Sequence, residues 1–525
     1  MIPKIHLGYE LYRSLRRGFF KTLLVDYGQP KPIRLKGGVL LALALDLAKE
    51  IKKEIPGKRV GVVLPPGVAG VMSNVALLLA DKSPVNLNFT FGSKNLRYAM
   101  KKSGVDAVLS ASLMQEKFPQ FPWPPNVLDI GDWLREKSRK KAELAWETLL
   151  VLVLPMRLRL KPRKEFEGKD SEGALLFTSG SSGNPKGVVL SHGNLLANCD
   201  QIAGLEIFSS TDKILANLPL FHSFGFTVAT ILPLMNRLTM VCAPSPLDLR
   251  TSLRAVRAEA VQVILGTPTF LKGYLRKAKK GEDLKSVRYV IAGAEKTPSG
   301  FKEKWESFCD CSYLEGYGLT ETSPVVSFNL PDSISPLGSA GKLLPGVEIR
   351  TLDVETERPL PSHQSGILCF RGPNVFGGYL DSPEETNQVL DKDGWFRTGD
   401  LGRVDERGYL FVEGRLSRFS KIGGEMVPHE KIEREVMEFL GAKQEEHQLC
   451  AIVGIEDQAK GEQLVLLTTR PVEAEVLRDK LSGRGFPNLW IPKRIKLIEE
   501  IPSLSTGKLD LRKIRELAEA DHENN

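Results

Sequence analysis

The stretch LLFTSGSSGNPKGVV, residues 175–189, is the most informative part of the chain. An apolar run leads into a Thr-, Ser- and Gly-rich loop that ends at Lys186, and a second apolar run follows. Small residues let backbone N–H groups approach an anion closely, and glycine tolerates the conformations that an anion nest needs. The loop therefore predicts phosphate binding. The residues that would make this contact are Thr178, Ser179, Gly180, Ser181, Ser182, Gly183 and Lys186.

Two other interpretations of this loop are less favoured. A flexible Ser/Gly linker is one, but apolar strand-like runs on both sides and the terminal Lys186 argue against it. A Walker A loop is the other, but Pro185 stands where G-x-x-x-x-G-K-[ST] requires its second glycine. The loop thus predicts phosphate contact without a P-loop NTPase fold.

Length and composition describe an ordinary globular protein of several domains. The chain has 525 residues, of which 42% are hydrophobic and 26% charged, and single cores rarely grow past ~250–300 residues. The formal net charge is +8, but Lys and Arg are spread along the chain, which disfavours a dedicated nucleic-acid binder. A mild basic excess also suits phosphate-bearing substrates, acidic protein partners or an anionic membrane surface, and charge does not choose among them.

The cysteines and the N-terminus both bear on the compartment. The six cysteines form no C-x-x-C pair, and in so large a chain this favours a reducing compartment over a disulfide framework. The first 18 residues, MIPKIHLGYELYRSLRRG, lack a continuous apolar run, so we expect no signal peptide. A cytoplasmic location is predicted.

The most apolar run is Leu149–Leu154, followed by the basic stretch MRLRLKPRK at 156–164. It is far shorter than the ~20 residues that span a bilayer. We favour a buried segment with a solvated basic flank. The alternative is peripheral contact with a membrane, with the apolar side toward lipid and the basic side toward phosphates.

Hydrophobic patterns predict layered α/β structure in the first part of the chain. Helices are expected at 37–55 and 71–80, and strands at 59–64, 84–88, 107–110, 174–178, 213–217, 239–242, 261–266 and 289–292. Strands that alternate with helices are typical of parallel α/β layers. Between 340 and 413 short strands with Gly and Pro turns replace this pattern, and a mixed α+β region follows. The predicted division is an N-terminal domain at 1–413, a hinge at 414–418 and a C-terminal domain at 419–525.

Four more segments follow the phosphate loop in a fixed order: EGYGLTET at 315–322, GWFRTGD at 394–400, GR at 414–415 and STGK at 505–508. Together they resemble the acyl-adenylate-forming superfamily of acyl-CoA synthetases, luciferases and nonribosomal peptide adenylation domains. The resemblance implies a large N-terminal domain of layered α/β subdomains with a β-rich subdomain, and a small mobile α+β C-terminal domain. It also implies an Mg-ATP-dependent enzyme that activates an acid as its acyl-adenylate and passes the acyl group to a thiol.

Three further segments, at 219–225, 292–296 and 421–427, look like the acyl-ACP synthetase half of bacterial 2-acylglycerophosphoethanolamine acyltransferase/acyl-ACP synthetases. None of the seven histidines has Asp five positions on, so we expect a synthetase without that family's acyltransferase motif. The resemblance predicts a fatty acid as substrate and acyl carrier protein as acceptor, with CoA as the alternative. The basic residues Arg415, Arg418 and Lys421 would offer the acidic carrier protein a complementary rim.

The resemblance assigns the nucleotide site residue by residue. The loop at 178–186 would hold the β- and γ-phosphates. In the segment at 315–320, Glu315 belongs to the site, Gly316 gives the base room, Tyr317 stacks on adenine and Thr320 contacts the α-phosphate. Glu321 would ligate Mg²⁺, which is usually bound by one or two carboxylates together with phosphate oxygens and water. Asp400 would bind the ribose hydroxyls. Arg415 would bind the ribose or a phosphate. Lys508 would reach the acid and α-phosphate during adenylation only.

The acyl site and the hinge are assigned in the same way. His222 would line the acid pocket, although a core histidine is the alternative. Its wall would be formed by the small residues Gly266, Thr267, Gly293 and Ala294. Arg418 takes the hinge position, where the superfamily has Asp or Lys. A non-catalytic acyl or nucleotide sensor is the competing class, and the presence of Glu321, Asp400 and Lys508 disfavours it.

Overall fold

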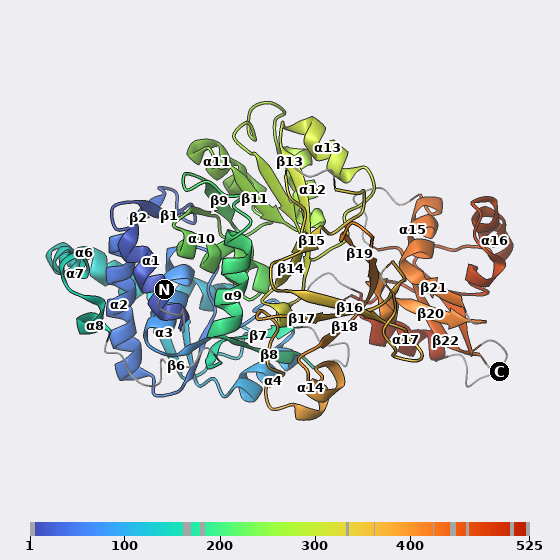
Figure 1. The fold of residues 1–525 in the computed structure, drawn as a ribbon, viewed down its shortest axis with the longest axis horizontal. Coiled ribbons are helices and arrows are strands. Elements are labelled where there is room, and N and C mark those ends of the chain that lie inside the picture. Colours follow the sequence, from blue (N-terminus) through green and yellow to red (C-terminus); the bar gives the residue numbers. More distant parts are fainter. Residues whose placement is uncertain are drawn as a thin grey trace.

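The structure is a computed structural model that describes residues 6–160, 170–178, 184–331, 335–361, 363–423, 425–441, 448–457, 461–503 and 509–520. Four β-sheets organise these residues. Figure 1 shows the helices and the two large sheets at one end of the molecule, and the last sheet with its helices at the other. This is the α/β and α+β architecture that the sequence predicts.

The largest sheet has nine strands in the order β15-β14-β13-β12-β11-β9-β10-β1-β2, and its central pairs are parallel. The strands are β1 (Thr22–Asp26), β2 (Ile33–Lys36), β9 (Lys213–Ala216), β10 (Thr239–Cys242), β11 (Val263–Gly266), β12 (Tyr289–Ala292), β13 (Ser312–Gly318), β14 (Val325–Phe328) and β15 (Lys342–Leu343). The apolar residues of the central strands are buried on both faces, as continuous Val, Ile and Leu runs predict, whereas Ile33 on the edge strand β2 is exposed.

The second sheet has six strands in the order β6-β5-β3-β4-β7-β8. Its strands are β3 (Arg59–Val62), β4 (Ser83–Asn86), β5 (Ala107–Ser110), β6 (Asn126–Asp129), β7 (Glu172–Thr178) and β8 (Lys186–Ser191). All neighbours are parallel except β7 and β8, which pair antiparallel. The phosphate loop therefore joins β7 to its neighbour β8, which is the edge strand of this sheet.

Helices pack on both large sheets and enclose two hydrophobic cores, a large one and a smaller one between the nine-stranded sheet and its last helices. Their bounds are α1 (Leu7–Arg17), α2 (Gly37–Glu54), α3 (Val68–Leu79), α4 (Ser93–Ser103), α5 (Ser112–Lys117), α6 (Ile130–Arg139), α7 (Lys141–Val153), α8 (Met156–Arg159), α9 (His192–Ala203), α10 (Leu232–Asn236), α11 (Leu249–Glu259), α12 (Pro268–Lys277) and α13 (Phe301–Phe308). The predicted helices at 37–55 and 71–80 are α2 and α3, and both are mostly buried.

The chain then builds two smaller sheets. The four-stranded one contains β16 (Glu348–Leu352), β17 (Gly366–Arg371), β18 (Phe396–Val404) and β19 (Leu410–Arg415), with α14 (Pro383–Val389) beside it. The five-stranded one contains β20 (Phe419–Ile422), β21 (Glu425–Pro428), β22 (Cys450–Asp457), β23 (Gly461–Thr468) and β24 (Arg494–Leu497), covered by α15 (His429–Phe439), α16 (Ala474–Gly483) and α17 (Leu511–Glu519). The chain passes from one sheet to the other between Arg415 and Phe419, through a short 3-10 turn.

The prediction that Leu149–Leu154 is a buried segment is wrong. These residues form the end of α7 and the turn after it, and only Val151 is fully buried. Leu149, Leu152 and Val153 are exposed. None of the helices in the described part of the chain has both the length and the apolar character needed to cross a membrane.

Candidate active site

The two strands that bracket the phosphate loop set its ends. Thr178 on β7 lies opposite Lys186 on β8 in the antiparallel register. The Lys186 ammonium lies 3.1 Å from a carboxylate oxygen of Glu385 and 5.0 Å from the ring centre of Tyr379. A cation is thus held at the exit of the loop. Five predicted phosphate-binding residues, Ser179, Gly180, Ser181, Ser182 and Gly183, lie outside the described residues.

Glu321 lies in a 3-10 turn (Thr320–Thr322) that follows β13. The Tyr379 hydroxyl donates a hydrogen bond of 2.9 Å to the Glu321 carboxylate, and the Phe376 amide donates to the Glu321 carbonyl at 2.8 Å. Burial raises the pKa of Glu321 above its ordinary value. Since Tyr379 also contacts Lys186, one phenol joins the end of the phosphate loop to the predicted metal ligand.

Tyr317, Asp400 and Arg415 form a second group. The Tyr317 hydroxyl donates to the Asp400 carboxylate, and the Arg415 guanidinium lies 2.8 Å from the other oxygen of that carboxylate. Asp400 and Arg415 are register partners on β18 and β19, so the four-stranded sheet fixes their pairing. Burial and the Asp400 charge raise the pKa of the Tyr317 phenol well above its ordinary value, so the phenol remains a donor.

The two groups are near neighbours. The Arg415 charge acts on the pKa of both Glu321 and Tyr379, and the Asp400 charge also acts on Glu321. The nine-stranded sheet supplies Tyr317 through β13, and the four-stranded sheet supplies Asp400 and Arg415. The site therefore lies where two sheets and the β7–β8 hairpin meet.

Thr320 connects this site to the segment that carries His222. The hydroxyl oxygens of Thr320 and Ser223 lie 3.3 Å apart. His222 precedes Ser223 and is exposed, with its ring 4.9 Å from that of Phe221. The alternative of a core histidine is therefore wrong. The residues that follow, Phe224–Ile231, form a π-helix, a rare element that often marks functional sites.

The small residues predicted for the acyl wall lie at the ends of adjacent strands. The Gly293 amide donates to the Gly266 carbonyl at 3.2 Å. A Cβ on Gly293 would come within 3.6 Å of both the Gly316 carbonyl and the Phe224 ring, so Gly293 lies between the nucleotide motif and the π-helix. Thr267 instead caps α12, accepting a hydrogen bond from the Phe270 amide.

Three more residues assigned by the resemblance, Ala294, Glu315 and Gly316, lie near the ends of β12 and β13. Ala294 adopts a left-handed conformation with φ of 67°. The Glu315 carboxyl is half-buried and accepts from the Thr297 hydroxyl, and burial raises its pKa. Gly316 has little room on the β14 side, because a Cβ there would lie 3.0 Å from the Phe328 ring.

The basic residues predicted to form a rim for the carrier protein are each bound to a carboxylate. Arg415 pairs with Asp400 and Lys421 with Glu355. Arg418 is buried, pairs with Glu433 and donates to the Ile452 carbonyl at 3.2 Å. The predicted rim is therefore wrong for Arg418, which is buried, whereas the side chains of Arg415 and Lys421 are 57% and 44% exposed in their pairs.

The described residues also include a His6, Asp81 and His192 cluster whose possible ligand atoms lie within 4.8 Å of one another. The Gly8 amide donates to His6 Nδ1 at 3.1 Å, so a neutral His6 ring carries its proton on Nε2. That nitrogen lies 3.5 Å from an Asp81 oxygen. A protonated Nε2 facing the carboxylate does not suit a metal ligand, and the cluster lies between the start of α1 and the turn after α3.

Glu321 fits a magnesium ligand by its chemistry. It offers hard carboxylate oxygens next to Tyr379, whose ring also contacts the Lys186 cation, and Mg²⁺ is usually bound through one or two carboxylates plus substrate phosphates. Lys508, the predicted adenylation lysine, lies outside the described residues. Tyr379, Ser223 and Glu385 were not predicted from the sequence.

Comparison with known proteins places this geometry in a family. The sequence profile of the family described as AMP-binding enzyme matches residues 40–380. The long-chain-fatty-acid–CoA ligase of Bacillus subtilis is 26% identical over 99% of this chain and 96% of its own. ATP-bound MatB from Rhodopseudomonas palustris has a TM-score of 0.76 and 25% identity, covering 97% of this chain and 98% of that one. O-succinylbenzoate CoA synthetase from Bacillus subtilis, in complex with ATP and magnesium, shares the fold with a TM-score of 0.78 and 21% identity, over 96% and 99%.

The fold combines two large α/β sheets, a β-rich unit and a smaller α+β unit, and the candidate site lies where the sheets meet. These features define the class of AMP-binding enzymes. The chain belongs to the AMP-binding enzyme family.

Proposed function

We propose that the protein activates a fatty acid with ATP, forming an acyl-adenylate, and transfers the acyl group to a phosphopantetheine thiol. The observation that carries the proposal is the convergence of Lys186, Tyr379 and Glu321 on one side, and Tyr317, Asp400 and Arg415 on the other. Cations beside carboxylates and buried phenol donors suit a ligand that has both phosphates and ribose hydroxyls.

In the first half-reaction the fatty carboxylate oxygen attacks the α-phosphorus of ATP. The bond from that phosphorus to its bridging oxygen breaks, and pyrophosphate leaves. Both reactants are anionic, so the site must neutralise charge and hold them in line. Lys186 and Arg415 would supply positive charge, the Thr320 hydroxyl would contact the α-phosphate, and Asp400 would bind the ribose. Magnesium, which Glu321 would hold, neutralises phosphate charge when it is bound.

In the second half-reaction the thiol sulfur attacks the acyl carbon, AMP leaves, and the thiol proton is lost to solvent. The acid would enter beside His222 and Gly293, which lie next to Ser223 and the π-helix. A long aliphatic chain would gain ~0.8 kcal/mol for each CH₂ that it buries. The name of the Bacillus subtilis relative, a long-chain-fatty-acid–CoA ligase, supports a fatty substrate.

The acceptor is proposed to be acyl carrier protein, with CoA as the second candidate because named relatives are CoA ligases. Helix α4 supports an anionic acceptor. Lys94, Arg97 and Lys101 are exposed along it. The Lys102 ammonium of the same helix donates to the Asp381 carbonyl at 2.9 Å, two residues from Tyr379. A basic helix face thus lies beside the site, where an acidic carrier protein or the phosphates of CoA would be attracted.

A peripheral contact with the membrane belongs to this proposal, because free fatty acids partition into lipid. It would bring the enzyme to its substrate.

The experiment supplies the purified protein with ATP, magnesium, palmitate and, in parallel, holo-acyl carrier protein or CoA, and measures thioester by mass spectrometry. Apo-carrier protein, which lacks the thiol, is the control. The proposal expects acyl-carrier thioester at a higher kcat/KM than acyl-CoA. If acyl-CoA is the only thioester formed, CoA is the acceptor and acyl carrier protein is excluded. If neither thioester forms and no pyrophosphate is released, the proposed function is overturned.

A further inference from the structure

Helix α7 and the short helix α8 present large apolar side chains to solvent. Those of Trp146, Leu149 and Val153 are 60%, 45% and 57% exposed, and their spacing of i, i+3 and i+7 places them on one face of α7. Leu152 and Leu158 are 38% and 65% exposed on the same pair of helices. We call Trp146, Leu149, Leu152, Val153 and Leu158 the apolar strip.

The orientation of α7 is fixed by its opposite side. Val151 is fully buried, and α7 packs on α2. The Glu147 carboxylate accepts from the Lys49 ammonium at 3.1 Å and from the Arg159 guanidinium at 2.5 Å. An ordinary surface helix turns its apolar side inward. The inner side thus holds Val151 and the paired Glu147, while the apolar strip faces outward, an arrangement typical of a surface that has a partner.

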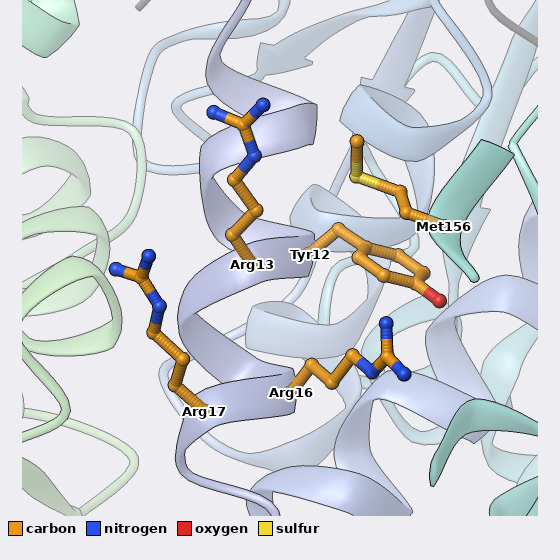
Figure 2. Close-up of a pocket in the computed structure, with 5 residues that line it drawn as sticks. All are labelled: Tyr12, Arg13, Arg16, Arg17 and Met156. Carbon is orange, nitrogen blue, oxygen red and sulfur yellow. The ribbon is translucent and has the colours of Figure 1, made fainter. Parts of the chain in front are cut away.

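A cluster of arginines borders the strip. Arg13, Arg16 and Arg17 lie at i, i+3 and i+4 in the last turns of α1, and with Tyr12 and Met156 they line an open cavity of about 460 Å³. Figure 2 shows Arg13 and Arg17 extending to one side of α1, and Tyr12 and Arg16 to the side where Met156 lies.

The arginine cluster and the apolar strip meet at Arg16. The Arg16 guanidinium donates to the Leu152 carbonyl at 2.9 Å, and Met156 of α8 closes the cavity. Cationic side chains therefore lie beside the end of α7 that carries the exposed Leu152 and Val153, and of these cations Arg13 also pairs with Glu10 at 2.7 Å.

We propose that the arginine cluster and the apolar strip together dock the protein on an anionic phospholipid membrane, with the arginines on lipid phosphates and the strip in the acyl region. Phosphate next to hydrocarbon is the chemistry of a lipid surface, and Trp, Leu and Arg on one face are typical of helices that lie in a membrane interface. A symmetric dimer through this surface would bring two arginine clusters toward each other.

The position of the surface suits this role. Figure 1 shows α7 and α8 at one end of the molecule and the five-stranded sheet with α15 and α16 at the other. Docking would thus leave the C-terminal part away from the lipid. The inference deepens the proposed function, on which it rests for the advantage of reaching a lipid-dissolved substrate, but the binding itself does not require catalysis.

The test is sedimentation of the purified full chain with vesicles of phosphatidylcholine alone or with added phosphatidylglycerol. We expect binding to the anionic vesicles and little to the neutral ones. R13Q/R17Q should bind anionic vesicles about thirtyfold more weakly, because each cationic side chain contributes about 1 kcal/mol to binding at an anionic surface. W146S/L149S/V153S should also lose binding, by more than tenfold, from the lost burial of three side chains.

Matched controls lie away from this surface. R478Q/K480Q removes two exposed charges from α16, and L113S/L337S/L497S removes three exposed leucines; both should bind vesicles as wild type does. No binding to either vesicle, or equal loss in the control variants, would overturn the inference. A dimeric wild-type protein and a monomeric strip variant, compared without vesicles by ultracentrifugation, would also overturn it. The strip would then be covered by a second copy of the chain.

The remaining outcomes separate this inference from the proposed function. Unfolding temperature checks that the variants fold, and the single change R17Q serves if the double variant does not. Adenylation of a short, water-soluble acid should be unchanged in the variants. Vesicle binding without any fatty acid activation would refute the proposed function alone, and fatty acid activation without vesicle binding would refute only the docking surface.

Discussion

The ionisation of Glu321 links the proposed metal site to pH. Replacement of Glu321 by Gln keeps an acceptor for the Tyr379 hydroxyl and removes the charge. We expect adenylation to slow by on the order of 10²–10³, the scale for loss of one preorganised electrostatic contact. Because burial raises the pKa of Glu321, metal binding should displace a proton and strengthen as pH rises toward neutral. A magnesium titration of pyrophosphate exchange at several pH values measures this; equal pH dependence in the variant would contradict it.

The same raised pKa makes a prediction for stability without nucleotide or metal. At pH values above the ordinary carboxyl pKa and below the raised one, the folded protein holds a proton that the unfolded chain has lost, so its stability falls as pH rises through this window. Glu321→Gln removes that dependence. The variant should gain unfolding temperature relative to wild type as pH rises toward neutral. A constant difference across that range would show that Glu321 carries no such burial cost.

Glu385 competes with phosphate for the Lys186 ammonium, which lies 3.1 Å from its carboxylate. Glu385→Gln should leave Lys186 available to the nucleotide and lower KM for ATP a few fold, since an exposed ion pair is worth ~0.2–1 kcal/mol. The value of kcat should change little. Steady-state kinetics at several ATP concentrations measure this, and a higher KM would mean that Glu385 orients Lys186 productively.

At the residue scale, local motifs were sufficient to single out Tyr317, Asp400 and Arg415, which the structure joins into one group. Tyr379 was missed because its partner Glu321 is 58 residues away and no local pattern marks the tyrosine. The same holds for Ser223, whose contact with Thr320 spans 97 residues. Contacts of this kind follow from sheet packing, which the sequence does not display.

At the scale of elements, Arg418 lies in the turn that leads to β20, at the predicted hinge. Its guanidinium pairs with Glu433 on α15 and donates to Ile452 on β22, so it belongs to the C-terminal unit. Arg418→Ala would leave the buried Glu433 carboxylate without its cation, and we expect a loss of about 3–5 kcal/mol in the stability of that unit. Hydrogen exchange of the peptides that cover β20 to β22 measures it.

The double variant R418M/E433L provides the control for that measurement. It replaces both charges by apolar groups, and such replacements of buried pairs are often neutral. Stability of the double variant near wild type, with a large loss in the single one, is the expected pattern. An unchanged single variant would show that the pair contributes nothing to this unit.

Most strands were predictable because buried parallel strands read as continuous apolar runs, as in β9, β10 and β12. Helix α7 was misjudged for a related reason. An apolar run predicts burial only if a partner surface exists, and here α2 covers one side while Trp146, Leu149 and Val153 face outward. The π-helix at Phe224–Ile231 also had no sequence signal, because its apolar composition suits any buried element.

At the scale of the whole molecule, the two half-reactions should depend differently on Lys508, which lies outside the described residues. By resemblance it reaches the site only during adenylation. Lys508→Ala should slow adenylation by on the order of 10²–10³, the scale for one preorganised charge. Thioester formation from supplied acyl-AMP should be largely spared. Separate assays of the two steps measure this, and an equal loss in both would refute a role confined to the first.

The central claim is that groups from two sheets and one hairpin converge on a single nucleotide so that a fatty carboxylate can displace pyrophosphate. Fatty-acid-dependent exchange of labelled pyrophosphate into ATP tests it most directly, because exchange needs reversible adenylation and no thiol acceptor. We expect exchange that requires both the acid and magnesium, and that falls by on the order of 10² or more in Glu321→Gln. Exchange that is absent with every fatty acid, or that proceeds equally without one, would contradict it.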